Sequence, residues 1–595
     1  MHILGISCYF HDASAALLRD GMLIAAAEEE RFSRKKHDAG FPEHAVRFCL
    51  EQAGVTVDDL DYVVFYEKPF LKFERLLGSL MATWPRSYRP FREAMIIWMT
   101  EKLWMKDLIR KRVGIPKNRI LFVEHHLSHA ASAFFCSPFD ESAILTVDGV
   151  GEWTTATLGK ATADWGSGER KNEIELFGEA RYPHSLGLLY SGFTAFLGFE
   201  VNDGEYKVMG MAPYGQPKYE DEVRKVIQVQ SDGSFALDLS YFSFHHSLTD
   251  TYSARFLELF GEPRDPRAEF FVEKDQIGYT GDDRELEKNR RYADVAASVQ
   301  RVTEETLLAA ARELHSRTGS KRLCFAGGVA YNSVANGRLL AETPFEELYV
   351  QPAAGDSGGA VGAALYVYHA LLGQPRKFVM QHAYWGSSYG PDRVAKACQE
   401  RGVSFERFEN DDKLLDLVAE ALAAGQVIGW SQGRFEWGPR ALGNRSILAN
   451  PTRDEMKEIV NTKIKFREPF RPFAPAILAE ATPSYFRLPS PNGHQPDPLK
   501  FMLAVLPIHE PMQSKIPACS HMGTGRLQTV EREVNPRYYG LIERFGLITG
   551  VPVLMNTSFN LRGEPIVTTP ENALNTFFNS GLDLLVLDNA LVRKP

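Results

Sequence analysis

Short apolar runs that end in polar or glycine residues recur along the first part of the chain. The first three predict strands over 3–7, 15–19 and 22–27, with Asp20-Gly21 as the hairpin turn between the last two. A polar loop, 10–14, separates the first two strands. This hairpin is either a sheet edge or a tight turn presented to a ligand, and the pattern alone leaves both readings open.

Further strand-then-helix units follow, and they place glycine or acidic residues directly after a strand. The predicted elements are strands over 120–123, 143–147, 323–326 and 348–350, and helices over 128–135, from about 333, and through an apolar stretch ending at 372. Open α/β sheets hold their ligands at such strand ends. The charged, weakly periodic stretch 261–289 predicts a loop excursion.

The pattern breaks at Gly373-Gln374-Pro375, where a new α/β segment begins. The chain has 595 residues, whereas single hydrophobic cores stop growing at roughly 250–300 residues. We therefore expect two large domains, 1–378 and 379–595. The apolar segment 94–105 is interrupted by Glu101 and Lys102, which favours a core or partner-facing helix over a lipid-facing one.

Composition narrows the class of protein. Hydrophobic residues make up 44% and charged residues 24%, which is ordinary for a folded soluble chain. A net charge of −9 argues against binding polyanions through bulk charge. The six cysteines form no C-x-x-C pair, and no apolar run reaches about 18 residues. We expect a cytoplasmic, multidomain α/β protein with neither nucleic acid nor membrane as a partner.

The segment 125–129 reads His-His-Leu-Ser-His. Residues i and i+4 share one helix face, so His125 and His129 can point at one ion while His126 faces away. Asp148 and Asp356 stand at strand-to-loop junctions, which gather at one sheet edge. Two imidazoles and two carboxylates suit Fe, Mn or Zn and leave positions open for a ligand. We favour this metal site over the alternative that both aspartates cap turns before glycines.

Three glycine loops, 148–151, 327–332 and 355–359, permit close backbone approach to phosphate or adenine. None is a Walker loop or a Rossmann fingerprint, and helix packing alone is the alternative explanation. Together with the N-terminal hairpin they resemble the nucleotide site of the actin, sugar-kinase and heat-shock-protein fold. The candidate nucleotide-binding residues are Gly149, Gly327, Gly328 and Asn332.

A basic cluster lies between Arg434 and Arg471. Nine Lys and Arg residues face five acidic ones there, a local excess of +4. The cations alternate with Pro and Phe, and fixed Arg side chains match the oxygens of phosphate or carbamate. Arg526 and the run 555–560 complete such an anion pocket. A surface ion-pair network is the alternative, and interleaved aromatics also suit nucleic acid.

Five motifs are specific in combination, namely 11–16, 125–130, 205–210, 326–330 and 438–446. Over nearly the whole chain they resemble the O-carbamoyltransferases of the nodulation-factor, cephamycin and tobramycin type. The resemblance implies an α/β fold. Its N-terminal domain is of the actin/sugar-kinase type, similar to the threonylcarbamoyl-transferase domain of tRNA modification, and a C-terminal YrdC-like domain follows.

The resemblance also implies a two-step reaction. The YrdC-like domain turns carbamoyl phosphate and ATP, with Mg²⁺, into carbamoyl-adenylate. The N-terminal domain then moves the carbamoyl group to a hydroxyl of a small-molecule acceptor, a secondary metabolite, and AMP leaves. Iron is the metal expected at the histidine–aspartate cluster, near the adenylate phosphate.

Site roles follow from the same resemblance. His11 is the candidate general base on the acceptor hydroxyl, because imidazole titrates near neutral pH, with Asp12 beside it. Lys207 ranks lower, as an electrostatic group or a partner of Glu205. The candidates for holding carbamoyl phosphate or the adenylate are Arg440, Lys465, Arg471, Arg526, Asn556 and Ser558.

Three rival functions are weaker. A hydrogenase-maturation carbamoyltransferase carries zinc fingers, which the cysteine spacing here does not provide. A tRNA threonylcarbamoylation enzyme needs a broader basic surface. A non-catalytic nucleotide-gated module leaves the basic cluster without a role. The acceptor and the oligomeric state stay open, with a homodimer among the alternatives.

Overall fold

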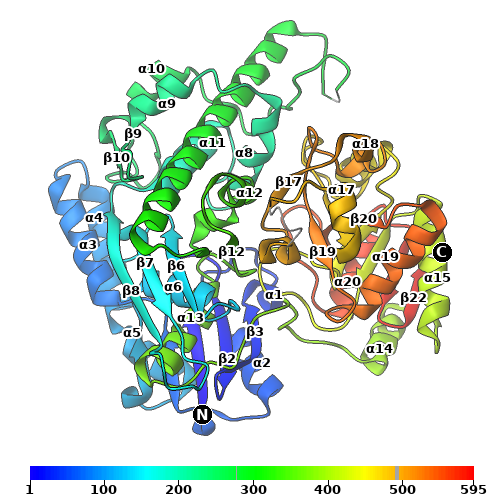
Figure 1. The fold of residues 1–595 in the computed structure, drawn as a ribbon, viewed down its shortest axis with the longest axis horizontal. Helices are drawn as coiled ribbons and strands as arrows, with labels where there is room; N and C mark the ends of the chain where they lie inside the picture. The colour runs from blue at the N-terminus through cyan, green and yellow to red at the C-terminus, as the bar shows by residue number, and fades with distance from the viewer. Residues whose placement is uncertain (277, 490–494, 595) are drawn as a thin grey trace. The chain divides into compact units, whose positions relative to one another are not determined.

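The computed structural model describes residues 1–276, 278–489 and 495–594. The chain forms two compact units that are both discontinuous in sequence. The first comprises Met1–Ile24 and Ala39–Val379, and the second comprises Ala25–Asp38 and Met380–Pro595. Figure 1 shows the elements of each unit coloured along the chain. No helix in the described part of the chain is long and apolar enough to cross a membrane.

The first unit contains two five-stranded sheets with the same strand order, apart from residues 25–28 at the end of one edge strand, which belong to the second unit. One sheet has the order β3 (Met22–Glu28), β2 (Ser14–Arg19), β1 (His2–Ser7), β4 (Tyr62–Phe65) and β5 (Ile120–Phe122). The other has the order β8 (Glu173–Arg181), β7 (Thr154–Thr162), β6 (Glu141–Val147), β11 (Arg322–Ala326) and β12 (Glu347–Tyr349). Counted along the chain within each sheet, both read 3-2-1-4-5. The structure therefore contains a repeat that the sequence does not display.

The pairing directions repeat as well. Strand β1 pairs antiparallel with β2 and parallel with β4, and β6 pairs antiparallel with β7 and parallel with β11. The strands predicted from alternating apolar runs are all present. This architecture confirms the predicted α/β fold.

Two helices lie between these sheets. Helix α13 (Gly358–Tyr366) packs on β1, β2 and β4, helix α6 (His125–Phe134) packs on β6 and β11, and the two helices pack on each other. The apolar helix predicted to end at 372 continues past α13 as a π-helical turn, Val367–Leu371. The carboxyl ends of strands from both sheets therefore meet near these two helices.

The remaining helices of the first unit cover the outer faces of the sheets or extend from them. They are α2 (Glu43–Ala53), α3 (Pro69–Ala82), α4 (Tyr88–Thr100), α5 (Met105–Val113), α7 (Leu186–Phe196), α8 (Glu205–Met211), α9 (Glu220–Val226), α10 (Ala254–Phe260), α11 (Asp283–Thr318) and α12 (Ser333–Glu342).

The prediction of a loop over 261–289 is wrong for its last residues, because α11 already begins at Asp283. Asp282 caps this helix by accepting a hydrogen bond from the backbone N–H of Arg284, 2.9 Å away. The charged residues from Asp283 to Lys288 form the first turns of this 36-residue helix, the long green helix in Figure 1.

The second unit is built on one eight-stranded mixed sheet. Its order is β13 (Phe405–Arg407), β22 (Ala590–Arg593), β21 (Leu584–Leu587), β14 (Ile428–Ser431), β15 (Arg445–Ala449), β20 (Val553–Ser558), β16 (Ala474–Leu478) and β19 (Gln528–Val530). Alternate residues bury on opposite faces, which gives one core around Ile447, Ile477 and Met555 and another around Trp430 and Leu554. Helices include α14 (Pro391–Arg401), α15 (Asp411–Ala423), α19 (Pro536–Thr549) and α20 (Pro570–Phe578). The YrdC-like character of this unit stays a prediction.

The segment Ala25–Asp38 belongs to the second unit through buried polar contacts. Glu28 accepts a hydrogen bond from the N–H of Gly438 at 2.7 Å, and Arg31 donates to the carbonyl of Gly438 at 2.6 Å. Thr568 donates to the carbonyl of Arg31 at 2.8 Å. The chain therefore enters the second unit early, leaves it, and returns only after Val379.

The packing of α13 depends on glycine at two positions. A Cβ at Gly362 would lie 1.8 Å from the carbonyl oxygen of Ser128 on α6. A Cβ at Gly5 would lie 1.8 Å from the carbonyl oxygen of Ala360 on α13. Neither contact leaves space for a side chain, since protein interiors are close-packed. Glycine at these two positions thus allows α13 to pack closely against α6 and β1.

We expect Gly362→Ala to lower the free energy of unfolding by roughly 3 kcal/mol or more, because the helices must separate to admit a methyl group. Urea unfolding measures the change. Gly390→Ala is the matched control, since nothing lies within 4 Å of an added Cβ there. Equal loss of stability in both variants would contradict this account.

Candidate active site

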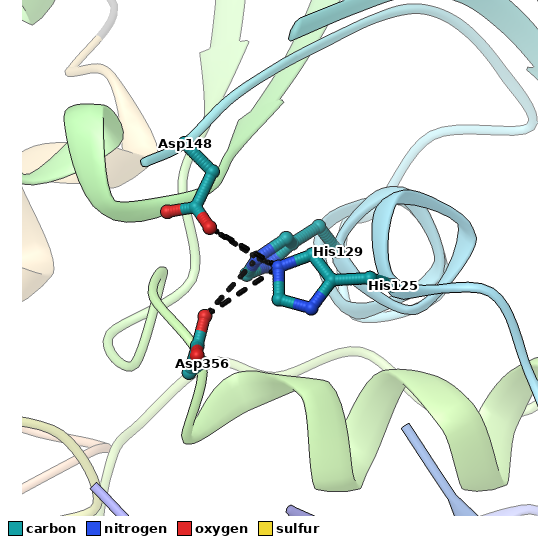
Figure 2. A group of neighbouring side chains, drawn as sticks. All are labelled: His125, His129, Asp148 and Asp356. Atoms are coloured by element: carbon teal, nitrogen blue, oxygen red, sulfur yellow. Dashed lines mark hydrogen bonds and ion pairs between the residues drawn. The ribbon is translucent and has the colours of Figure 1, made fainter. Parts of the chain in front are cut away.

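Helix α6 carries both histidines of the predicted metal site. His125 and His129 lie one turn apart and point to the same place, as Figure 2 shows. Their Nε2 atoms are 3.0 Å from each other. Both rings are buried. The helix starts at His125, earlier than predicted, because Glu152 accepts a hydrogen bond from the His125 backbone N–H at 3.0 Å. Helical spacing thus directs both rings to one point.

Two carboxylates face these rings. Asp148 follows β6 and Asp356 precedes α13, so residues far apart in sequence meet at one place (Figure 2). His125 Nε2 lies 3.1 Å from Asp148 Oδ2 and 3.6 Å from Asp356 Oδ1. His129 Nε2 lies 3.7 Å from Asp148 Oδ2 and 3.6 Å from Asp356 Oδ1. The structure therefore brings the four predicted ligands together in a buried cluster.

Outer hydrogen bonds orient both carboxylates. The backbone N–H of Gly328 donates to Asp148 Oδ1 at 2.7 Å, which leaves Oδ2 to face the histidines. The hydroxyl of Tyr66 lies 3.4 Å from Asp356 Oδ2, which leaves Oδ1 to face them. Metal-binding side chains are commonly oriented in this way. Tyr66 was not singled out in the sequence because nothing local marks it.

The separations fit one metal ion. Metal–ligand distances of about 2.1 Å place neighbouring ligand atoms of a tetrahedral ion about 3.4 Å apart. Here the four ligand atoms all lie within 4.8 Å of one another. Two imidazole nitrogens 3.0 Å apart repel unless a proton or a cation lies between them. The donor set is thus suited to a transition-metal cation.

The pKa shifts in the cluster also favour a bound cation. Burial disfavours a charged imidazole, but hydrogen bonds and charges from Asp148 and Asp356 raise the pKa of His129 to about 9. Burial also opposes ionisation of Asp148, yet His125 and His129 hold its pKa well below the usual range. The site therefore favours positive charge among its ligand atoms.

His126 has a different role, as the helical spacing predicted. Its Nδ1 lies 2.6 Å from the hydroxyl of Thr146, and its Nε2 lies 2.9 Å from the carbonyl of Thr154. Burial, together with the neighbouring His125 and His129, lowers the pKa of His126 well below its usual value. His126 is a neutral structural residue that ties α6 to the β6–β7 region.

The glycine loops border this cluster. Gly328 contacts Asp148, and Gly327 has φ of +95° with Val147 O only 2.2 Å from where a Cβ would stand. Gly149 has nothing within 4 Å of an added Cβ, so packing does not explain a glycine there. Asn332 caps α12 and hydrogen-bonds Gln300 at 3.0 and 3.1 Å, which gives it a structural role.

The predicted acceptor-side residues lie elsewhere in the first unit. His11 Nδ1 is 2.8 Å from Asp12 Oδ2, and His11 Nε2 is 3.0 Å from the carbonyl of Asn202. Asp12 has φ of +41°, so the backbone is strained at this loop. Lys207 Nζ lies 5.5 Å from the centre of the Phe199 ring. Asp12 therefore orients the His11 imidazole, as a carboxylate does beside a general base.

In the second unit, Lys465 and Ser558 meet at the end of the central strand β20. Lys465 is buried, and its Nζ donates to the carbonyls of Ser558 at 2.7 Å and Asn560 at 2.8 Å. It also lies 2.7 Å from Asn560 Oδ1. Asn560 was not among the predicted residues, although the run 555–560 contained it.

Positive charge accumulates around this lysine. Burial, together with the charges of Arg467 and Arg471, lowers the pKa of Lys465 well below its usual range. Arg471 Nη1 lies 3.5 Å from Glu468, a long ion pair between partly exposed groups. An anion bound here would relieve the mutual repulsion of these cations.

Asn556 lies two residues before Ser558 on the same face of β20. Its Nδ2 donates to the carbonyl of Ala441 and to Gln528 Oε1, each at 3.2 Å. Its buried Oδ1 has no hydrogen-bond partner among the described residues. Two of the predicted arginines are half-buried. Arg440 precedes Ala441, and Arg526 lies on β18 (Thr524–Arg526). Asn556 thus lies beside the loop that carries Arg440.

Glu436 shapes the loop around Arg440 and was not predicted as a site residue. Its Oε1 accepts hydrogen bonds from the backbone N–H groups of Leu442, Asn444 and Arg445, at 2.8, 2.8 and 3.1 Å. The carboxylate is buried. One oxygen therefore fixes three amides of the 438–446 motif, a role that only the folded chain reveals.

We expect Glu436→Ala to leave these three amides without an acceptor. The free energy of unfolding should fall by about 3 kcal/mol, since buried unsatisfied donors are costly. Hydrogen exchange at Leu442, Asn444 and Arg445 should accelerate. Glu436→Gln keeps a carbonyl oxygen and should show a smaller effect. Unchanged exchange in Glu436→Ala would contradict the assigned role.

Comparisons with known proteins agree on one class. A family model described as "Carbamoyltransferase N-terminus" matches residues 2–365, and one described as "Carbamoyltransferase C-terminus" matches residues 419–594. The chain belongs to the carbamoyltransferase family and is therefore a transferase enzyme.

Several curated proteins are similar over most of their length. Protein sll1178 of Synechocystis sp. is 45% identical over 627 residues, covering 100% of this chain and 97% of that protein. Nodulation protein NolNO of Sinorhizobium fredii is 37% identical over 593 residues, covering 98% of this chain and 79% of that protein. The nodulation-type resemblance read from the motifs is thus confirmed.

Solved structures overlap with part of the fold. The HypF protein of T. kodakarensis has a TM-score of 0.31 and 17% identity, covering 63% of this chain and 48% of that chain. The ROK hexokinase of Thermus thermophilus has a TM-score of 0.27 and 14% identity, covering 61% of this chain and 98% of that chain.

Proposed function

We propose that the protein is an ATP-dependent O-carbamoyltransferase. The second unit makes carbamoyl-adenylate from carbamoyl phosphate and ATP, and the first unit transfers the carbamoyl group to a hydroxyl of a small-molecule acceptor. The observation that supports it most is the cation cluster of buried Lys465 with part-buried Arg467 and Arg471, in which burial and the two arginines lower the pKa of Lys465. Such a cluster is matched to a small, strongly anionic substrate.

The reaction balances as follows. With one water, carbamoyl phosphate yields inorganic phosphate and carbamate. A carbamate oxygen then forms a bond to the α-phosphorus of ATP, and pyrophosphate leaves. In the transfer step the acceptor hydroxyl forms a bond to the carbamoyl carbon, its proton passes to a base, and AMP leaves. Every carbamoyl transferred therefore yields one phosphate, one pyrophosphate and one AMP.

In the second unit, Lys465 and the arginines Arg440, Arg471 and Arg526 are proposed to bind the phosphoryl and carbamoyl oxygens. Asn556 presents a buried carbonyl oxygen without a hydrogen-bond partner among the described residues, which suits the carbamoyl NH₂ group. Ser558 is held by Lys465 and Asn560, so its hydroxyl is fixed in position. If these side chains enclose the substrate, excluding water would also limit hydrolysis of an unstable carbamoyl compound.

In the first unit, His125, His129, Asp148 and Asp356 are proposed to hold a metal ion, for which iron is the expectation. A cation here would offset the negative charge of the AMP leaving group. Gly149, Gly327 and Gly328 give backbone access beside the cluster for the nucleotide. His11, oriented by Asp12, is proposed to take the acceptor proton at its imidazole.

We expect the protein to release pyrophosphate from ATP and carbamoyl phosphate without an acceptor. Lys465→Met should lower this release by roughly 100-fold, because it removes a preorganised cation. Lys463→Met is the matched control, since Lys463 is exposed two residues away. A coupled assay for pyrophosphate measures both. Formation of ADP without pyrophosphate would contradict the proposal and favour a kinase-like or chaperone-like ATPase.

We expect His129→Ala to lose the bound metal, because it removes one of four ligand atoms. Metal content by plasma mass spectrometry measures this, and pyrophosphate release should be retained since adenylate formation is assigned to the other unit. His126→Gln is the control and should keep its metal. Full metal content in His129→Ala would refute the ligand assignment.

A further inference from the structure

Helix α3 buries charged side chains and exposes apolar ones. Its buried residues are Pro69, Lys72, Arg75 and Leu80, whereas Phe70 is exposed. Lys72 is 5% exposed and Arg75 9% exposed. Helices of soluble proteins usually bury an apolar face and turn their charges to water. The burial of two cations one helical turn apart therefore needs a physical reason.

The two buried cations differ in their partners. Lys72 Nζ lies 2.5 Å from Glu67 Oε2, so these two charges form a buried pair. Arg75 Nη1 is fully buried and has no hydrogen-bond partner in the described part of the chain. A buried charged group without a partner is costly, since it has lost its water and gained nothing in return. Packing alone does not account for Arg75.

An aromatic ring covers one face of the Arg75 guanidinium. Its central carbon lies 5.1 Å from the centre of the Tyr182 ring, and the backbone N–H of Tyr182 donates to the carbonyl of Trp153 at 2.8 Å. Both aromatic residues are partly exposed, so this side of α3 borders solvent. A ring stacked on a guanidinium leaves the N–H groups at its edge available, and these match the oxygens of phosphate or carboxylate.

Two buried acids act on Arg75 but bond elsewhere. Burial lowers the pKa of Arg75, although the Glu67 and Glu152 carboxylates oppose this shift. Glu67 is already paired with a lysine. Glu152 Oε1 accepts hydrogen bonds from the backbone N–H groups of Lys68 at 2.8 Å and His125 at 3.0 Å. Neither carboxylate is therefore the hydrogen-bond partner of Arg75.

The buried face of α3 lies beside both parts of the candidate active site in the first unit. Glu152 joins the start of α3 to the backbone of His125, the first metal-ligand candidate on α6. Lys72 Nζ lies 4.9 Å from the centre of the Phe10 ring, and Phe10 directly precedes His11, the candidate base. A ligand bound at this face would lie next to the groups assigned to the transfer step.

We propose that Arg75 binds an oxyanion of a substrate of the transfer step, either a phosphate of the nucleotide or an acid group of the acceptor. Both present oxygen atoms that a guanidinium can bind through two N–H groups. The inference deepens the proposed function and rests on its assignment of carbamoyl transfer to the first unit. The bound anion supplies the hydrogen bonds that the fold does not give to Nη1.

Isothermal titration calorimetry of the full-length protein with inorganic phosphate, AMP and acetate tests this proposal. Arg75→Met should weaken the binding of at least one of these anions by roughly ten-fold or more, because it removes a charge-assisted hydrogen bond. Arg75→Lys keeps the charge without the two-pronged geometry, so its affinity should be intermediate, and it carries the test if the methionine variant does not fold. Arg92→Met removes an exposed cation from α4 and is the matched control.

The probes separate the two sources of the anion. If Arg75 binds the nucleotide phosphate, Arg75→Met weakens AMP binding and leaves adenosine binding unchanged. If it binds an acid group of the acceptor, Arg75→Met weakens phosphate or acetate binding but not AMP binding, and phosphate still binds to protein saturated with AMP. Binding at the Lys465 cluster is common to all the proteins compared and does not contribute to the difference.

The proposal is overturned if the parent protein and Arg75→Met bind phosphate, AMP and acetate equally well, or if Arg92→Met loses the same affinity. These titrations need no turnover. Failure to release pyrophosphate from ATP and carbamoyl phosphate would refute the adenylation step without changing them, so the two failures can be told apart.

Discussion

The contact of α13 with α6 is the constraint on which the first unit depends. Gly362 lets the carbonyl of Ser128 approach to a distance that any side chain would forbid, and Gly5 does the same between β1 and α13. The His125 and His129 rings and the Asp356 carboxylate, which stand on or beside these helices, meet only because the helices approach so closely. A few ångströms of separation would leave two unpaired imidazoles and a buried carboxylate, each costly on its own. The histidine–aspartate cluster and the backbone packing are therefore one structural unit.

The two units carry sites that favour ligands of opposite charge. In the first, carboxylates raise the pKa of His129, so the site favours a cation. In the second, burial and the neighbouring Arg467 and Arg471 lower the pKa of Lys465, so the site favours an anion. Both imbalances are created by burial, which strengthens every uncompensated charge. The proposed reaction uses both properties, with the anion site binding carbamoyl phosphate and the cation site holding a metal ion beside the leaving AMP.

Local signals in the sequence predicted seven strands of the first unit and the start of α12, but they did not predict β4, β7, β8 or the individual elements of the second unit. The strands, the His125–His129 spacing and the positions of Asp148 and Asp356 at strand ends could be read from periods of two and 3.6 residues. The role of Glu436 could not, because its three hydrogen bonds form only when the loop folds around it. The duplicated sheet order could not be read from the sequence either, because topology is set by which strands pair and not by their composition.

The path of the chain has a consequence for how this enzyme can be divided. Three covalent crossings join the units, after Ile24, after Asp38 and after Val379. A gene cut once at the last crossing would yield a C-terminal fragment lacking Glu28 and Arg31, and the amide and carbonyl of Gly438 would lose their partners. Recombination at a single point therefore cannot exchange one unit intact.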